Sequence, residues 1–480
     1  MYDVLIIGCG ITGAATAFAL SKYRLRVGIL ERENDVATGT TKANSAILHA
    51  GYDPVPGSLM AKLNVRGVAL AKELCRALDV PYRQCGSFVL AFSDEEVPTL
   101  EELLRRGQEN GVPGLELLSG EEARGLEPNL SPSVTAALHA PSAAICSPWE
   151  FCLALAETAV VNGAELHLDT AVTGLEQDDG VWRVHTNQGE FEARYVVNAA
   201  GVHADQIHDM AAPHAFDIRP SRGQYFLLDK AEGSRVSRVI FQCPNKDGKG
   251  VLVAPTVHGN LIVGPNAEPA EREDVSTTAE GLNFVRTKAT KSVPSIAFPQ
   301  SIRNFSGIRA HGDGDDFILQ EAESAPGFFD LAGICSPGLS AAPAIGEYAA
   351  GLLGKAGLEL TEKETFRCER HRTRFKELPV EERAELVERE PAFGRVICRC
   401  ETVTEGEILE AIHSPIPPRS VDGVKRRAGA GMGRCQGGFC APRVVEILSR
   451  ELGLRPDEIV QDRAGTWLLA GETKGGHSNV

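Results

Sequence analysis

The sequence predicts an α/β protein with a Rossmann-like nucleotide-binding domain, an inserted domain built on an antiparallel sheet, and a small helical domain near the C-terminal end. Three observations predict this architecture. The first 31 residues have the pattern strand, glycine turn, helix, strand. Residues 215–330 are rich in strand-forming runs, and four clustered cysteines follow a highly charged stretch at 359–391.

The N-terminal pattern has the features of a dinucleotide site. A short apolar run leads into Gly8-Cys9-Gly10-Ile11-Thr12-Gly13, then into a helical stretch of small residues and a second apolar run that ends in Glu31. Gly8 permits the tight turn, Gly10 lets the backbone approach a pyrophosphate, and Gly13 lets helix and strand pack closely. The helix N-terminus favours the pyrophosphate, and Glu31 can accept hydrogen bonds from a ribose diol. A purely structural glycine turn is the alternative interpretation.

Two later stretches also bring small residues to the end of an apolar strand. The run 195–201 ends in Ala199, Ala200 and Gly201. The run 328–333 ends in Gly333 and leads into Ser336-Pro-Gly338-Leu339-Ser340 and a small-residue helix. Both predict backbone passing close to a nucleotide. Between them, 223–228, 250–255 and 260–264 are expected strands of an antiparallel sheet that is suited to hold a substrate.

The composition shifts give the expected domain boundaries. The nucleotide-binding domain takes 1–80, 145–212 and 330–357; the substrate domain takes 81–144 and 213–329; a charged linker takes 358–392, the cysteine domain 393–458, and a tail 459–480.

The bulk composition excludes several classes of protein. A chain of 480 residues has room for two or three domains. The net charge of -16 argues against a nucleic-acid partner, because phosphate contacts need clustered Lys and Arg. The chain starts almost directly in a strand and has no long apolar run. We therefore expect a cytoplasmic protein without a transmembrane segment, which reaches the inner membrane only through a partner. Eight of the 12 cysteines are scattered and are expected to be small buried hydrophobes.

Residues 1 to about 355 resemble the group of FAD-dependent glycerol-3-phosphate dehydrogenases and L-2-hydroxyglutarate oxidases, within the D-amino-acid-oxidase-like flavoproteins. The resemblance rests on the glycine turn with its acid, Ser45-Ala-Ile-Leu-His49-Ala-Gly51, Tyr195–Gly201, Phe305-Ser-Gly-Ile-Arg309 and Ser336–Ser340. It implies FAD as the cofactor. Only one Gly-x-Gly-x-x-Gly follows a strand, so the expected reductant is the substrate and not NAD(P)H. The residues expected at FAD are Gly8, Gly10, Ile11, Thr12, Gly13, Glu31, Thr41, Asn44, Ser45, Ala199, Ala200, Gly201, Gly333, Ser336, Gly338, Leu339 and Ser340.

The last four cysteines have a spacing of their own. Cys398-Arg-Cys400 is followed after 34 residues by Cys435-Gln-Gly-Gly-Phe-Cys440. This pattern resembles the iron–sulfur domain of bacterioferritin-associated ferredoxins, and it implies a [2Fe–2S] cluster held by four thiolates. A structural zinc site and four free cysteines are the alternatives. The wording around Cys435 resembles the A subunits of anaerobic glycerol-3-phosphate dehydrogenases most, and related tails occur on amino-acid and opine dehydrogenase subunits.

The resemblance also suggests catalytic roles. Oxidation of a secondary alcohol requires removal of the hydroxyl proton and transfer of a hydride to the flavin. His49 is the first candidate base or orienting group, with a buried structural histidine as the alternative. His311 is the second, with a loop histidine as its alternative. Arg309 is the candidate clamp for the substrate anion, and Arg222 is a possible second cation; surface or structural ion pairs are the alternatives for both.

These features predict an enzyme that oxidises a small anionic hydroxy substrate and exports electrons. The preferred function is oxidation of sn-glycerol 3-phosphate to dihydroxyacetone phosphate, with electrons passing through the cluster to a partner subunit or a quinone. The alternatives are an L-2-hydroxyglutarate or other 2-hydroxy-acid dehydrogenase or oxidase, and an amino-acid or opine dehydrogenase subunit. A cluster that takes one electron at a time favours a dehydrogenase over an oxidase. A non-enzymatic docking or metal-storage protein is a remote third possibility.

Overall fold

The computed structural model describes residues 1–244 and 250–471, which form two compact units. Unit 1 contains residues 1–32 and 36–370; unit 2 contains Glu33–Asp35 and the chain from His371 onward. The predicted linker 358–392 is therefore divided between the two units. Residues 245–249 of the predicted substrate domain and 472–480 of the predicted tail lie outside the described residues.

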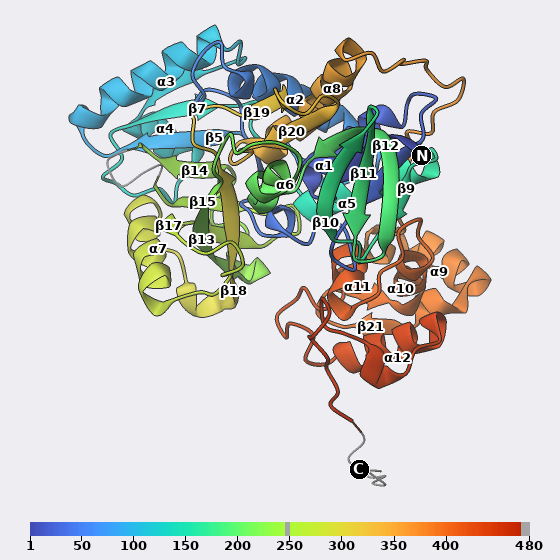
Figure 1. Cartoon of the computed structure of the whole chain (residues 1–480). Helices are drawn as coiled ribbons and strands as arrows, with labels where there is room; N and C mark the ends of the chain where they lie inside the picture. The colour runs from blue at the N-terminus through green and yellow to red at the C-terminus, as the bar shows by residue number, and fades with distance from the viewer. Residues whose placement is uncertain (245–249, 472–480) are drawn as a thin grey trace. The chain divides into compact units, whose positions relative to one another are not determined.

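The first sheet of unit 1 has eight strands around a parallel centre (Figure 1). Its main order is β10-β11-β12-β1-β2-β9, and β20 pairs in parallel with the end of β12. The alternation of short apolar strands and helices favours this parallel centre, since each crossover helix covers a face of the sheet. The strands are β1 (Tyr2–Ile7), β2 (Val27–Leu30), β9 (Glu165–His167), β10 (Val172–Asp178), β11 (Val181–Thr186), β12 (Gly189–Asn198), β19 (Ile318–Glu321) and β20 (Phe328–Ala332).

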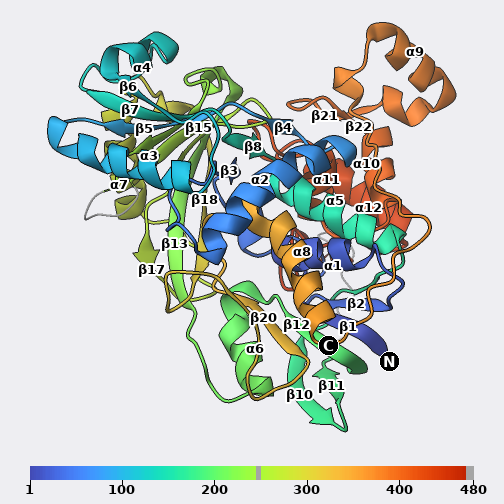
Figure 2. The same ribbon diagram turned by 90° about the horizontal axis from the view of Figure 1, so that it is seen from above.

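Four helices pack side by side on this part of unit 1 (Figure 2). They are α1 (Ile11–Leu20), α2 (Leu59–Ala77), α5 (Pro148–Val161) and α8 (Gly338–Lys355). Helix α1 contacts both α5 and α8, and α8 also contacts α2. The sequence predicts an amphipathic helix over 147–162, but α5 is buried over nearly its whole length. Burial against other helices and the ion pair of Glu157 with Arg370 replace the expected polar face.

The second sheet of unit 1 has nine strands and follows the order β17-β13-β16-β15-β14-β5-β7-β6, with β18 also paired to β13. It is antiparallel as predicted, except that β14 and β5 run parallel. Helix α7 (Ala279–Ser292) lies on it, and its core is mostly valine, leucine and isoleucine. The strands are β5 (Ser87–Ala91), β6 (Glu116–Ser119), β7 (Ala136–Ala140), β13 (Arg219–Leu228), β14 (Val239–Gln242), β15 (Leu252–Pro255), β16 (Leu261–Gly264), β17 (Glu268–Pro269) and β18 (Ser301–His311).

Short elements join these layers. A small sheet has the order β3-β8-β4 and carries the loop before His49. The remaining elements of unit 1 are β3 (Ile47–Leu48), β4 (Tyr82–Arg83), β8 (Ala144–Cys146), α3 (Val97–Glu109), α4 (Gly120–Leu126) and α6 (Ala204–Ala211). Ser119 and Glu122 form a capping box at the start of α4.

Unit 2 is a small helical domain with its own apolar core. Its elements are α9 (Val380–Arg389), β21 (Val396–Cys398), β22 (Val403–Thr404), α10 (Glu405–Ile412), α11 (Val421–Ala428) and α12 (Ala441–Leu452). Thr404 and Glu407 form a capping box at the start of α10. Gly429 ends α11 in the left-handed conformation, with φ of 80°, and so acts as the helix C-cap.

A buried ion cluster also belongs to unit 2. Asp35 accepts hydrogen bonds from Arg427 at 2.8 and 2.9 Å and from Arg426 at 2.8 Å. Arg426 also reaches Asp462 at 2.7 Å. Burial by itself would raise the pKa of Asp35, but Arg427 and Arg426 outweigh it and lower the pKa to about 2. The cluster is therefore charged at neutral pH, and each member depends on its partners.

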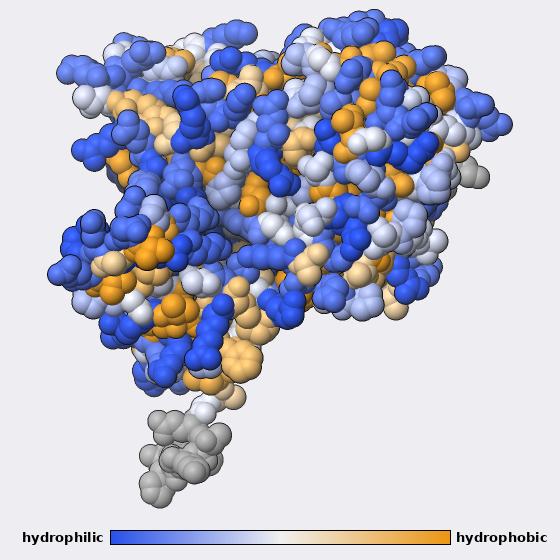
Figure 3. Space-filling view, turned by 180° about the vertical axis from the view of Figure 1, so that it is seen from behind, coloured by the Kyte–Doolittle hydropathy of each residue, from blue (hydrophilic) through white to orange (hydrophobic). Residues whose placement is uncertain are grey.

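The described residues contain no helix long and apolar enough to cross a bilayer. On the face drawn in Figure 3, apolar residues are interspersed with hydrophilic ones.

Candidate active site and cysteine centre

The turn after β1 accepts only glycine at two positions. Gly8 has φ of +97°, and a Cβ at Gly8 would lie 2.6 Å from the backbone oxygen of Ala199. A Cβ at Gly13 would overlap the backbone oxygen of Gly8. The backbone N–H of Ala199 donates to the backbone oxygen of Ile7 at 2.9 Å, so the end of β12 lies against this turn. The predicted small-residue segments 8–13 and 199–201 therefore meet, with Gly201 at φ of +59°.

The start of α1 forms an anion site beside a buried acid. Gly10 begins the helix in extended conformation and has no side-chain cap. One oxygen of Glu31 accepts the N–H of Cys9 at 2.8 Å, and Glu31 is 8% exposed. Thr41 Oγ1 accepts the N–H of Ile11 at 3.0 Å. A helix N-terminus, close backbone approach and a fixed carboxylate at the end of the second strand match the needs of a dinucleotide.

The loop at 40–46 is held in place by its own polar residues. Asn44 Oδ1 accepts the N–H of Ala46 at 2.8 Å, and its Nδ2 donates to the backbone oxygen of Thr41 at 2.8 Å. Thr40 Oγ1 donates to the backbone oxygen of Ile308 at 2.6 Å, and a Cβ at Gly307 would overlap the backbone of Ala43. The loop thus lies directly on strand β18. Of the predicted cofactor residues here, Thr41 and Asn44 shape the loop, and Ser45 reaches the Tyr225 hydroxyl at 3.2 Å.

The start of α8 positions the loop that carries His49. Ser340 Oγ accepts the backbone N–H of His49 at 2.7 Å. Gly338 and Leu339 open α8, whose N-terminus has no side-chain cap. Gly333 directly follows β20 and has φ of +64°, and a Cβ added there would point towards Gly312. The predicted segment 333–340 therefore joins a helix N-terminus to the candidate catalytic histidine.

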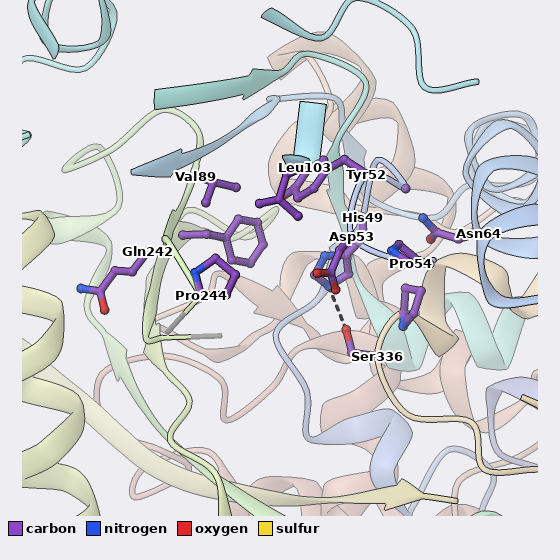
Figure 4. A pocket seen from close by; sticks show the side chains of 13 residues that line it. His49, Tyr52, Asp53, Pro54, Asn64, Val89, Leu103, Gln242, Pro244 and Ser336 are labelled. Atoms are coloured by element: carbon purple, nitrogen blue, oxygen red, sulfur yellow. Dashed lines mark hydrogen bonds between the residues drawn. The ribbon is translucent and has the colours of Figure 1, made fainter. Parts of the chain in front are cut away.

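A pocket opens beside His49 (Figure 4). Ser336 Oγ and His49 Nε2 lie 3.3 Å apart, and the Phe241 ring stacks on the imidazole with centroids 5.6 Å apart. Burial raises the pKa of Tyr52 in the pocket wall, so its hydroxyl stays neutral. His49 is thus held at both its backbone and its ring, facing a cavity. The lining residues are His49, Gly51, Tyr52, Asp53, Pro54, Asn64, Val89, Leu103, Phe241, Gln242, Pro244, Ser336 and Pro337.

Asn64 is a pocket residue that the motifs do not predict. It lies in the middle of α2, is 0% exposed, and neither atom of its amide has a hydrogen-bond partner among the described residues. An unpaired buried polar group costs about 1–3 kcal/mol. Only its position in the sequence could have indicated a role for Asn64. It interrupts the buried stripe of α2 with a polar residue of low helix propensity.

Arg309 lies on β18, close to the loop at 40–46. Its side chain is half-buried, and Nη2 donates to the backbone oxygen of Asn266 at 3.2 Å. A Cβ at Gly223 would approach Nη2 to 2.5 Å, so the missing side chain lets the guanidinium cross strand β13. This single backbone contact leaves most of its donors for another acceptor. The role of Arg309 as an anion clamp stays a prediction.

Arg222 and His311 have other surroundings. The Arg222 guanidinium donates to Asp274 at 2.6 Å and to Glu268 at 3.1 Å, and its side chain is 9% exposed. Two acids neutralise this cation, which favours the structural alternative. His311 ends β18 opposite Arg219 and is outside the pocket lining. The structure therefore brings His49 and Ser336 together but does not bring Arg222 or His311 to them.

The four clustered cysteines form two pairs in unit 2. The sulfurs of Cys400 and Cys435 lie 3.6 Å apart. A hydrogen bond from Cys440 lowers the pKa of Cys398 to about 6, and the backbone N–H of Phe439 lowers the pKa of Cys435. In the part of the chain that the structure describes, no three Cys, His, Asp or Glu side chains converge on one metal ion. Two separate pairs suit a two-iron cluster better than a single zinc.

Glycines give this centre its room. A Cβ at Gly433 would overlap that of Cys400, and Gly437 has φ of +90° directly after the loop residue Gln436. Phe439, between Cys435 and Cys440, is 85% exposed. The cysteine segment 435–440 therefore combines close-packed glycine backbone with one exposed aromatic side chain, Phe439.

Comparison with known proteins decides the family. The model of the DAO family, described as FAD dependent oxidoreductase, matches residues 3–352. The chain belongs to this FAD-dependent oxidoreductase family. FAD is therefore its cofactor, and the turn at 8–13, the uncapped start of α1 and Glu31 fit that group. The resemblance seen in the sequence and the predicted fold class are confirmed.

Similar proteins match this flavoprotein over 62% to 99% of its length. It is 50% identical over 476 residues to a protein named glycerol 3-phosphate dehydrogenase from Caloramator mitchellensis, covering 99% of both chains. It is 29% identical over 301 residues to an L-2-hydroxyglutarate dehydrogenase from Indibacter alkaliphilus, covering 62% of this chain and 75% of that one. A solved L-alpha-glycerophosphate oxidase from Mycoplasma pneumoniae with FAD bound matches with a TM-score of 0.73 and 33% identity, covering 77% and 98%.

The cysteine domain matches a family of its own. The model described as BFD-like [2Fe-2S] binding domain matches residues 396–450 of this flavoprotein. The second cofactor is therefore a [2Fe–2S] cluster, and the four sulfurs in two pairs fit it. The predicted cluster is confirmed over the zinc alternative.

Proposed function

We propose that this flavoenzyme oxidises sn-glycerol 3-phosphate to dihydroxyacetone phosphate. The observation that carries the proposal is the 50% identity over 99% of both chains with the protein named glycerol 3-phosphate dehydrogenase. An alignment of this extent spans the pocket, the loop at 40–46 and the four-cysteine domain. The structure supports it with a histidine-bearing pocket that belongs to the flavin-binding unit.

In this proposal the eight-stranded sheet binds the cofactor and the nine-stranded sheet forms the substrate domain. Bound FAD would supply the acceptor for the hydride of the substrate's carbinol carbon. His49 takes the hydroxyl proton, because Ser340 holds its backbone, and Ser336 and the Phe241 ring hold its imidazole at the pocket. The ring is fixed before substrate arrives, so little reorganisation is needed for proton transfer.

Arg309 is the proposed clamp for the substrate phosphate. Its guanidinium has one backbone acceptor at 3.2 Å and is only half-buried, so a dianion can approach its remaining donors. Gly223 and the loop at 40–46 bracket the strand from which Arg309 projects. Removal of this cation should weaken substrate binding more than it slows the hydride step.

The four clustered cysteines would hold the [2Fe–2S] cluster, which would supply a one-electron relay to a partner protein or a quinone. Phe439 supports the docking of an acceptor, since an 85% exposed aromatic ring sits between two ligand cysteines. Any contact with a membrane would then be made through that acceptor.

A 2-hydroxy acid is the second candidate substrate. Relatives named L-2-hydroxyglutarate dehydrogenase are 29–34% identical over parts of this chain. The carbinol chemistry at His49 is the same for both substrates, and Arg309 would then bind a carboxylate. The two differ at the groups that flank the carbinol carbon.

The first experiment is an anaerobic titration of the holoenzyme, followed by the flavin absorbance band. We expect sn-glycerol 3-phosphate to bleach the band and L-2-hydroxyglutarate to leave it unchanged. Bleaching by hydroxyglutarate alone would transfer the assignment to the second candidate. Bleaching by neither would remove both and favour an amino or imino acid.

A matched pair of variants tests the clamp. Arg309→Met should raise the substrate concentration needed for half-maximal reduction by about tenfold or more, as expected for loss of a charge-assisted contact. Arg303→Met is the control, because Arg303 is an exposed arginine on the same strand. Equal effects of the two substitutions would remove Arg309 from the substrate site.

A further inference from the structure

The starting observation is a buried amide without a protein partner beside the catalytic histidine. Asn64 is fully buried on α2, and both its Nδ2 and its Oδ1 lack hydrogen-bond partners among residues 1–244 and 250–471. Its neighbours in the buried stripe of the helix are small or apolar, such as Ala61, Ala71 and Cys75. An asparagine that serves packing alone would be replaced there by leucine with no polar group to desolvate. Its two orphaned atoms therefore point to a ligand.

The pocket supplies the direction. Asn64 and His49 line the same cavity, and Figure 4 shows the Asn64 amide pointing from α2 towards His49 and Asp53. Gly51, at φ of +112°, leaves room for the amide, because a Cβ there would lie 2.9 Å from Nδ2. A substrate with its carbinol carbon beside His49 would bring a neighbouring group towards this amide.

The chemistry of the lining limits what the amide can bind. Among the described lining residues there is no lysine or arginine, and Asp53 contributes a carboxylate. A hydroxyl is suitable, because it donates to Oδ1 and accepts from Nδ2, so it satisfies both atoms of the amide.

We propose that Asn64 binds the terminal primary hydroxyl of glycerol 3-phosphate and thereby selects this substrate over 2-hydroxy acids. The assignment rests on the proposed function and deepens it. Glycerol 3-phosphate carries a neutral CH₂OH next to its carbinol carbon, whereas a 2-hydroxy acid carries a carboxylate there. A carboxylate only accepts hydrogen bonds, so it would leave Oδ1 unpaired. The phosphate is then left for Arg309, the clamp proposed above.

The test compares two substrates that differ by this one hydroxyl. The probes are sn-glycerol 3-phosphate and the propane-1,2-diol 1-phosphate of matching configuration, each mixed anaerobically with holoenzyme in a stopped-flow instrument. The quantity measured is the ratio of their second-order rates of flavin reduction. The wild-type enzyme should prefer glycerol 3-phosphate by about tenfold or more, because a site built to bond a hydroxyl rejects the analogue that lacks it.

Asn64→Leu should reduce this preference to near unity. Asn283→Leu is the matched control, because it makes the same change at an exposed position of helix α7, and it should keep the wild-type ratio. Asn64→Asp is the isosteric second variant, which keeps an acceptor and loses the donors. It can still accept the hydroxyl proton of glycerol 3-phosphate, so it should keep a preference over the deoxy probe that Asn64→Leu loses. Flavin absorbance reports whether each variant retains FAD.

Three outcomes overturn the assignment. Equal loss with both probes in Asn64→Leu would make Asn64 a packing residue. A wild-type ratio near unity would exclude recognition of the terminal hydroxyl without reference to any variant. Absence of wild-type bleaching by glycerol 3-phosphate would instead remove the proposed function, and this assignment with it. A ratio that collapses only at position 64 supports the proposal.

Discussion

Replacement of Asp35 by asparagine should loosen unit 2 selectively. The substitution keeps the size of the side chain and removes the charge that balances Arg426 and Arg427, which are 5% and 2% exposed. Another acid of this cluster, Asp462, pairs with Arg426 at 2.7 Å. Arg427 would be a buried guanidinium that has lost its carboxylate partner Asp35, which is the condition under which breaking a buried pair is most costly.

The magnitude follows from the pKa of Asp35. Its ordinary pKa is 3.8, and in the folded protein the two arginines overcome the effect of burial and lower it to about 2. The difference corresponds to about 2 kcal/mol of preference for the charged form, since each pKa unit is worth about 1.4 kcal/mol. This stabilisation is complete above about pH 4 and is lost as the pH falls through about 2, because the folded-state pKa is the lower one.

Hydrogen–deuterium exchange of the α11 and α12 amides in the holoenzyme at pH 7 is the assay. A loss of about 2 kcal/mol or more should accelerate exchange by about 30-fold or more. Glu446→Gln is the control, since Glu446 pairs with Arg443 on α12 with both side chains more than 60% exposed. An exposed pair is worth at most about 1 kcal/mol. Equal exchange in the two variants would refute the reasoning.

Three further predictions concern the cofactors and the site. His49→Gln should slow flavin reduction by about 10²- to 10⁴-fold with FAD content unchanged; a loss under tenfold in stopped-flow measurements would assign the ring to packing against Phe241. Cys435→Ser should abolish the electron paramagnetic resonance signal of the reduced cluster while substrate still bleaches the flavin, and loss of both would show that the two units do not act separately. Gly13→Ala should release FAD on gel filtration, because its methyl group would overlap a backbone oxygen, whereas Gly39→Ala, with open space around it, should retain FAD.

Local patterns were sufficient for the parts of the fold that are made locally. The glycine turn, α1, α8 and the capping box at Thr404 depend on residues a few positions apart, so periodicity and turn chemistry predict them. The same holds for the four cysteines, whose spacing is tied to the ligand set.

Tertiary partners explain what the sequence could not predict. Strands β5 and β14 pair in parallel although about 150 residues separate them, and no local pattern encodes that choice. The sequence offers Arg222 as a possible substrate-binding cation, but the fold pairs it with Glu268 and Asp274. Asn64 reads as an ordinary helix residue until the pocket is known. The three-residue segment Glu33–Asp35 gives no sign of membership in unit 2, because its defining contact is an ion pair almost 400 residues away in the chain.

The loop at 40–46 contacts both the start of the helix at the dinucleotide turn and the strand of the proposed substrate clamp. Thr41 accepts the N–H of Ile11 in the first turn of α1, while Thr40 and Ala43 contact the strand that carries Arg309. With Arg309 as the proposed clamp, this short segment would couple cofactor binding to binding of the substrate anion. The expected result is an ordered assembly, in which apoprotein has little affinity for substrate and flavin supply sets the number of competent molecules. When riboflavin is scarce, the apoprotein would therefore be inactive and would not hold substrate in an unproductive complex.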